Sequence, residues 1–164
     1  MTIADGTIIT SVIDTLAICS SIIESAENEV VYLSPLPLLV LAPQFSLTEK
    51  TNVFIRKGGR IRGIPDISYL YIEKIRDFLD NGVDVHNFHQ YPGIFMLVGD
   101  EKESISTMSI DVGSFSIDTP VVALWSDDPT YADYLMSTFE VTWEQSVSAA
   151  QQIEELLKEG PPKV

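Results

Sequence analysis

The apolar residues near the start of the chain are spaced as on one face of a helix. Thr10 or Ser11 can cap this helix, which ends by Glu29. Its apolar positions recur every three or four residues, at Val12, Ile13, Leu16, Cys19, Ile23 and Ala26. The next apolar run, residues 30–33, is too short for a helix and rich in β-formers, so it predicts a central strand.

Two further helix–strand pairs follow. Residues 46–49, with the sequence Ser-Leu-Thr-Glu, have the form of a capping box, and the helix that they begin should end at Gly58. Residues 60–64 then predict a second strand. A third helix is expected between residues 66 and 82, and the apolar positions after it predict a third strand over 83–88.

The second half of the chain predicts three more strands and a long helix. Residues 94–98 form an apolar run that should lie in the middle of the sheet. Residues 104–110 should pair with them as a hairpin, nearer an edge because their alternate positions are polar, and residues 121–125 predict another buried strand. The Asp127-Asp128-Pro129 sequence begins a helix that reaches Glu159. Because one rod of this length would be roughly 45 Å long, we expect a break near residues 146–148.

These elements together predict an α/β fold with a mixed central β-sheet flanked by helices and a long, broken C-terminal helix. Strands separated by helices should pair in parallel, and strands joined by short turns should pair antiparallel. A chain of 164 residues fits one domain, expected over residues 10–160, with a flexible N-terminus at 1–9 and a frayed tail at 161–164.

Charge and cysteine content narrow the classes of partner. The formal net charge is −14, and surplus carboxylates repel phosphate backbones and anionic membranes, so this segment is not expected to bind nucleic acid or membrane directly. Cys19 is the only cysteine, which excludes an intrachain disulfide and a structural zinc site and fits a buried thiol. The first residues lack the pattern of a signal peptide and no apolar stretch is long enough to cross a bilayer, so we expect a cytoplasmic location.

The predicted central strand lies within an eight-residue segment, residues 93–100, which we call the motif frame. Residues 93–100 have the sequence Gly-Ile-Phe-Met-Leu-Val-Gly-Asp, and Asp100 is placed as the acid of a His-x-Lys-x4-Asp motif. The histidine position of that motif is Gly93 and the lysine position is Phe95. Glycine supplies no nucleophile, and phenylalanine cannot offset the charge of a phosphate. We therefore assign no catalytic residue and predict that the protein is not an enzyme.

With this degenerate frame, the order of elements resembles one half of the phospholipase D fold. More narrowly, it is similar to the non-catalytic version found in archaeal TrmB-type transcriptional regulators and sensor kinases. The likeness spans residues 10–160 and is carried by loose motifs at residues 21–30, 60–64, 72–78, 93–95 and 139–144, with Ala149, Ile153, Glu154 and Leu156.

The resemblance implies a non-enzymatic sensory or regulatory domain of signal transduction or transcriptional control. Such domains are often homodimers, and this one would bind an unidentified small-molecule or protein ligand and need no cofactor. No helix-turn-helix or kinase pattern is seen in this sequence, which leaves open whether it is part of a longer protein or a free-standing relative.

Five polar residues are candidate contacts for the ligand or partner. Arg56, Arg60 and Arg62, with Lys57, place four of the ten basic residues within seven positions. They could hold an anionic ligand or an acidic partner; alternatively, Arg56 stabilises a helix C-terminus and the other arginines pair with surface acids. His86 and His89 fit solvated loop histidines better than metal ligands, so no metal site is assigned.

The terminal helix offers one more candidate surface. Its aromatic residues, which include Trp143, are typical of packing against the sheet. After the expected break, Ile153, Leu156 and Leu157 form a narrow apolar seam that could pack on the same domain, on a twin subunit or on an output domain. Trp143 and this seam are the candidate dimer or signalling helix. Two other functions stay open: a phosphodiester hydrolase with an unrecognised site, and a protein-interaction adaptor.

Overall fold

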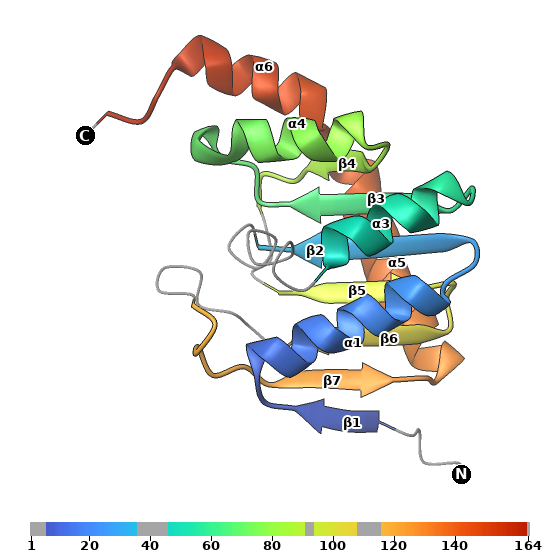
Figure 1. Cartoon of the computed structure of the whole chain (residues 1–164). Helices are drawn as coiled ribbons and strands as arrows, with labels where there is room; N and C mark the ends of the chain where they lie inside the picture. The colour runs from blue at the N-terminus through green and yellow to red at the C-terminus, as the bar shows by residue number, and fades with distance from the viewer. Residues whose placement is uncertain (1–5, 36–45, 91–93, 108–115, 164) are drawn as a thin grey trace.

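The computed structural model describes residues 6–35, 46–90, 94–107 and 116–163 (Figure 1). Its strands are β1 (Gly6–Ile9), β2 (Glu29–Ser34), β3 (Arg60–Pro65), β4 (Asp84–Asn87), β5 (Met96–Gly99), β6 (Glu103–Thr107), β7 (Ala123–Ser126) and β8 (Val147–Ser148). Its helices are α1 (Val12–Ser25), α3 (Leu47–Arg56), the short 3-10 helix η2 (Tyr69–Tyr71), α4 (Ile72–Asp80), α5 (Pro129–Gln145) and α6 (Ala149–Glu159). The predicted order of elements is confirmed, and the structure adds β1 and β8.

The strands form one eight-stranded sheet in the order β1-β7-β6-β5-β2-β3-β4-β8. Helical connections join β2, β3 and β4, which are parallel. The neighbours β5, β6 and β7, which have no helix between them among the described residues, are antiparallel. The central pair, β2 and β5, is antiparallel and gives the sheet its mixed character. This confirms the predicted mixed sheet, because a short turn can only return the chain antiparallel, whereas a crossover helix allows parallel pairing.

Helices cover the two faces of the sheet unequally. In Figure 1, α1, α3 and α4 lie on one face, and α5 crosses the other. The alternation of side chains along β2 explains this arrangement. Val30 belongs to the core cluster that α1, α3 and α4 cover, whereas Val31 and Leu33 belong to the cluster around Phe139 of α5. α6 contacts the β4 end of the sheet and contributes Ile153 to the first cluster.

The N-terminal edge differs from the prediction. Residues 6–9 were expected to be flexible, but they form the edge strand β1, and residues 1–5 lie outside the described residues. β1 pairs with β7 along its whole length, from Gly6 opposite Ser126 to Ile9 opposite Ala123. Ile9 also packs against the core. The sequence analysis did not predict this strand, because its structure depends on pairing with β7, which is far away in the sequence.

The helix ends follow the predicted capping only in part. Ser46 has a left-handed backbone (φ 59°) and makes no side-chain capping bond, so the capping box predicted at residues 46–49 is wrong, although α3 does begin there. By contrast, Ser148 Oγ accepts a hydrogen bond from the Gln151 amide (3.2 Å) at the start of α6. Because Val147 and Ser148 are extended and pair with β4, α5 and α6 are separate helices, and the predicted break is confirmed.

β6 lies between β5 and β7, one strand nearer to the β1 edge than β5, as expected. Its two serines are buried or half-buried. Ser104 is fully buried, and Ser106 Oγ lies 2.8 Å from the hydroxyl oxygen of Tyr131 on α5. The alternation was therefore read correctly, but its polar side is covered by a helix with its own polar groups.

Candidate functional site

The motif frame of residues 93–100 extends along β5. Gly93 lies outside the described residues. Phe95, immediately before β5, is 3% exposed and belongs to the core cluster on the α1 face. Its amide donates to Thr107 Oγ1 (3.1 Å), and its carbonyl accepts from the Thr107 amide (2.8 Å). The side chain at the lysine position of the frame is thus held inside the core by the neighbouring strand.

Asp100 lies at the other end of β5, roughly 16 Å away at about 3.3 Å per residue. Its carboxylate accepts hydrogen bonds from the amides of Glu27 (2.7 Å), Asn28 (2.8 Å) and Glu29 (2.9 Å). Partial burial disfavours the charged form, but these three hydrogen bonds outweigh it and hold the pKa of Asp100 below its ordinary value. The acid of the frame therefore supports the turn that leads into β2, far from Phe95.

Arg62 of β3 is the centre of an ion-pair cluster on the α5 face. Its guanidinium donates to both carboxylate oxygens of Glu29 (3.0 Å each) and to both oxygens of Glu140. The side chain is only 8% exposed, and Cζ lies 5.0 Å and 5.3 Å from the ring centroids of Phe139 and Trp143. The hydrogen bond with Glu140 raises the pKa of Arg62 and lowers the pKa of Glu140.

Two of the three candidate arginines are paired with acids of the same domain. Arg60 is mostly exposed and lies 3.3 Å from Asp84 and 3.8 Å from Glu29. Arg62 is neutralised as described above. Arg56 is exposed in the last turn of α3. For Arg60 and Arg62, the structure shows the alternative in which the arginines pair with acids of the same domain.

The two candidate histidines have different surroundings. The His86 ring stacks on Trp143 of α5 with centroids 3.6 Å apart, and its Nδ1 lies 2.7 Å from Ser146 Oγ. Burial lowers the pKa of His86, although nearby Asp84 acts in the opposite direction. The expectation of a solvated histidine is wrong for His86, because β4 turns it onto α5. His89 is exposed in the turn after β4.

His86 and Phe95 lie on opposite faces of the sheet. His86 contacts α5, whereas Phe95 packs in the cluster that α1 covers. The structure thus keeps the candidate histidine, the lysine position and the acid of the frame apart. Within the described residues, no group of three or more His, Cys, Asp or Glu side chains could hold a metal ion.

Three of the four residues assigned to a dimer or signalling helix pack within the domain. Trp143 stacks on His86, Ile153 is 6% exposed, and Leu156 packs against the same core cluster. Leu157 is the exception, with an exposed fraction of 49%. Any partner surface on α6 would therefore centre on Leu157.

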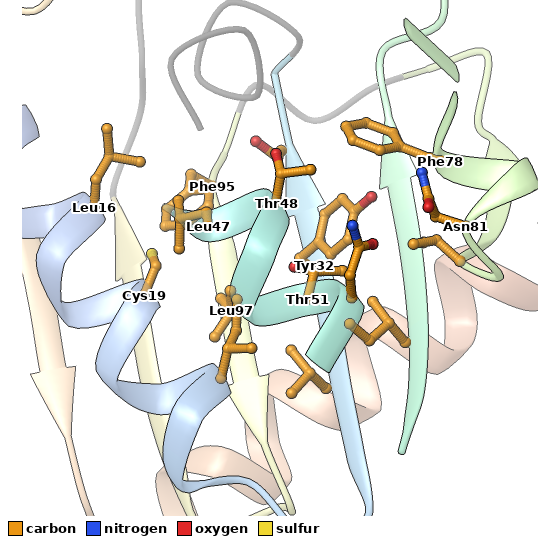
Figure 2. Close-up of a pocket in the computed structure, with 16 residues that line it drawn as sticks. Leu16, Cys19, Tyr32, Leu47, Thr48, Thr51, Phe78, Asn81, Phe95 and Leu97 are labelled. Atoms are coloured by element: carbon orange, nitrogen blue, oxygen red, sulfur yellow. The ribbon is translucent and has the colours of Figure 1, made fainter. Parts of the chain in front are cut away.

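A cavity of about 80 Å³ lies between α1, α3 and the central strands (Figure 2). Phe95 forms part of its wall, beside Leu97 of β5 and Tyr32 of β2. The other lining residues come mostly from the facing helices and neighbouring strands: Leu16, Cys19, Ile23, Val30, Ser34, Leu47, Thr48, Thr51, Asn52, Ile61, Phe78, Asn81 and Val83. None of the five candidate contact residues from the sequence lines this cavity.

A few polar residues line one side of this mostly apolar cavity. Thr48, Thr51 and Asn52 of α3 line it, with Asn81 from the end of α4. Thr48 Oγ1 is buried and has no hydrogen-bond partner among the described residues. Burial also raises the pKa of the Tyr32 hydroxyl above its ordinary value. The sequence held a signal for this side, since positions 48, 51 and 52 fall on one face of a helix, but it did not show that this face meets a cavity.

Gly63 makes room for the Tyr32 ring in the cavity wall. A Cβ at this position would lie 2.1 Å from Tyr32 Cζ, far closer than any real contact. Gly63 and Tyr32 stand opposite each other in the paired strands β3 and β2. Close approach across the sheet thus explains the glycine in a strand that is otherwise rich in branched residues.

Comparisons with known proteins give the fold. No family model and no curated protein matches the sequence. The solved structures that resemble it include TrmBL2, an archaeal chromatin protein whose structure shows a novel mode of DNA binding (TM-score 0.65, 14% identity, 90% of this chain and 55% of that chain covered). They also include Nuc from Salmonella typhimurium, a phospholipase D family member (TM-score 0.66, 11% identity, 88% and 98% covered). NucT from Helicobacter pylori is similar as well (TM-score 0.61, 15% identity, 88% and 98% covered).

This chain spans about half the length of TrmBL2 and nearly the whole length of Nuc. Within the described ranges, no helix is long and apolar enough to cross a membrane. The sheet order, the helices on both faces and these likenesses agree, and the chain therefore has the phospholipase D fold.

Proposed function

We propose that this protein is a non-catalytic regulatory domain that binds a small molecule in the cavity beside Phe95. The observation that carries the proposal is the place of Phe95 itself. At the position where the motif frame would hold a phosphate-binding lysine, the side chain is buried and forms a wall of an apolar cavity. These buried, apolar surroundings suit an apolar ligand and not a charged phosphodiester.

The surroundings of the charged groups support the same proposal. Phosphoryl chemistry needs a nucleophile and a cation that converge on one point. Here the carboxylate of Asp100 is occupied by three backbone amides, and the guanidinium of Arg62 is occupied by two carboxylates. His86 is held against Trp143 on the opposite face from Phe95.

The cavity lies between helices and strands, so a bound ligand would regulate the protein by changing how these elements pack. A ligand in it would contact α1, α3 and the central strands at the same time. A ligand can shift a conformational equilibrium only through a difference in its contacts with the two states. The packing of α3 on the sheet is therefore the feature that ligand binding would bias in this proposal.

The catalytic alternative is tested by turnover of bis(4-nitrophenyl) phosphate. We expect the wild-type protein to release no nitrophenol above the uncatalysed rate between pH 5 and 9. The His86→Ala and His89→Ala variants should be indistinguishable from it. Turnover by the wild type that disappears in either variant would overturn the proposal. Turnover that persists in both would overturn it as well if the activity follows the protein through chromatography, and would indicate a contaminating hydrolase if it separates.

Native mass spectrometry tests the binding and assembly parts of the proposal. We propose that the protein forms a homodimer, and the spectrum reports subunit number and retained small molecules together. A Leu157→Glu variant should weaken the dimer if the exposed part of α6 forms the contact. A wild-type monomer at micromolar concentration would contradict dimerisation without affecting the ligand site.

A further inference from the structure

The charge of the cavity lining specifies the class of ligand. We infer that the cavity takes a small, uncharged molecule with a compact apolar body and one hydrogen-bonding group; this inference rests on the proposed function and names its ligand. None of the described residues that line the cavity is charged. In a protein with 34 Asp, Glu, Lys and Arg residues among 164, this is a marked local difference.

An ion could not be accommodated there without a partner. Moving a charged group out of water is costly unless an opposite charge or several hydrogen bonds compensate for it. Lys50 of α3 is paired with Glu24, and Arg62 of β3 is paired with Glu29 and Glu140 on the other face of the sheet. The lining therefore selects against carboxylates, phosphates and ammonium groups.

The size of the cavity limits the ligand to a few heavy atoms. Its volume is about 80 Å³. An engineered protein cavity of about 150 Å³ accommodates benzene. A branched body of about four carbon atoms is therefore the scale of group that fits.

The hydrogen-bonding group of the ligand would meet the α3 side. Thr48 Oγ1 is buried without a partner among the described residues, and a ligand hydroxyl or carbonyl would supply one. Two other buried polar atoms share this condition, Ser104 Oγ and Gln152 Oε1, but neither residue lines the cavity. Of these three buried atoms without a partner, only Thr48 Oγ1 belongs to a residue that lines the cavity.

Cys19 indicates that the ligand is bound and not chemically modified. Its thiol lines the cavity, and burial raises its pKa to about 12. It therefore stays protonated at neutral pH and is a poor nucleophile. In this site the thiol acts as a small apolar group.

Three probes with one carbon skeleton test the charge requirement: isobutanol, isobutyrate and isobutylammonium. Each is titrated into the 15N-labelled full chain at pH 7. We expect isobutanol to shift the amide resonances of Cys19, Thr51 and Leu97 in a saturable way. The two ions, at the same concentrations, should leave these resonances at least tenfold less shifted.

Two variants test where the probes bind, and they separate the contribution of the Thr48 hydroxyl from that of the cavity space. Thr48→Val keeps the side-chain shape but removes the hydroxyl, so we expect at least a fivefold weaker affinity for isobutanol and unchanged binding of xenon, followed by 129Xe NMR. Cys19→Leu fills the cavity and should abolish binding of both probes. If Cys19→Leu does not fold, Thr48→Val and the comparison of the three probes still decide the matter.

The outcomes distinguish this inference from the proposed function. Binding of isobutyrate or isobutylammonium at the same residues, as tight as that of isobutanol, would overturn the ligand class but leave a non-catalytic binding domain. Exclusion of xenon and isobutanol alike would remove the cavity as a site. Neither result bears on catalysis, which the phosphodiester assay tests by itself.

Discussion

Arg62 on one face of the sheet and Thr48 on the other show two different arrangements of a buried polar group. On the α5 face, the guanidinium of Arg62 is bonded to two carboxylates and lies over two aromatic rings. On the α1 and α3 face, the hydroxyl of Thr48 has no partner among the described residues and borders a cavity. One face contains a closed network of charges, and the other contains uncharged space with unused hydrogen-bonding capacity.

This difference shows why the most conspicuous residues of the sequence are not the best site. Charged side chains attract attention, but burial requires that they be paired, and pairing removes their capacity to bind anything else. Small hydroxyl and amide side chains can be buried at lower cost. They are therefore the groups that a protein can leave available for a ligand.

The largest effect is expected from breaking the closed network. Arg62→Ala leaves Glu29 and Glu140 close together without their cation, and it should lower the free energy of unfolding by about 3 kcal/mol. Arg60→Ala is the matched control, because Arg60 is 60% exposed and its loss should cost less than about 1 kcal/mol. Urea denaturation at pH 7 measures both. Equal losses in the two variants would contradict the distinction between the buried and the exposed arginine.

A smaller loss of stability is expected from changing Asp100, whose carboxylate accepts hydrogen bonds from three backbone amides. Asp100→Asn removes the charge and one acceptor, and it should cost about 1–2 kcal/mol at pH 7. Because the folded-state pKa of Asp100 is lowered, its stabilisation is complete above the ordinary value of 3.8 and is lost as the pH falls through the folded value. The difference between wild type and variant should therefore shrink at low pH.

Glu101→Gln is the control for this measurement, since Glu101 lies in the same turn and is exposed. It should change the free energy of unfolding by less than about 0.5 kcal/mol. A loss at Asp100 that stays constant down to pH 2 would show that the side-chain shape, and not the carboxylate charge, supports the turn.

The smallest change in stability is expected from a substitution at Thr48, on the α1 and α3 face, and it should have the opposite sign. Thr48→Val removes a buried hydroxyl that has no described partner, so stability should stay the same or rise by up to about 1 kcal/mol. Thr15→Val is the matched control, because Thr15 is also buried but its Oγ1 donates to the Ser11 carbonyl (2.8 Å). We expect the control to lose about 1 kcal/mol in thermal or urea unfolding. A comparable loss at Thr48 would mean that its hydroxyl already has a partner.

Local patterns were sufficient for much of the fold. The apolar run of residues 94–98 predicted the central strand β5, and the Asp127-Asp128-Pro129 sequence predicted the start of α5, where Asp128 caps the Thr130 amide. The break before α6 was also predictable from its length. Capping at residue 46 was not, because the backbone of Ser46 is left-handed and its side chain makes no capping hydrogen bond with the helix amides.

The sequence by itself determined the order of the elements, the mixed pairing of the strands and the substitution of Phe95 in the motif frame. These follow from neighbouring residues, since periodicity, caps and turn lengths act over a few positions. Only the tertiary structure decided that Arg62 is closed off by Glu29 and Glu140 and that Phe95, Tyr32 and Thr48 border one cavity. Those contacts join segments that are far apart in the chain, and whether a buried polar group finds a partner depends on which segments the sheet brings together.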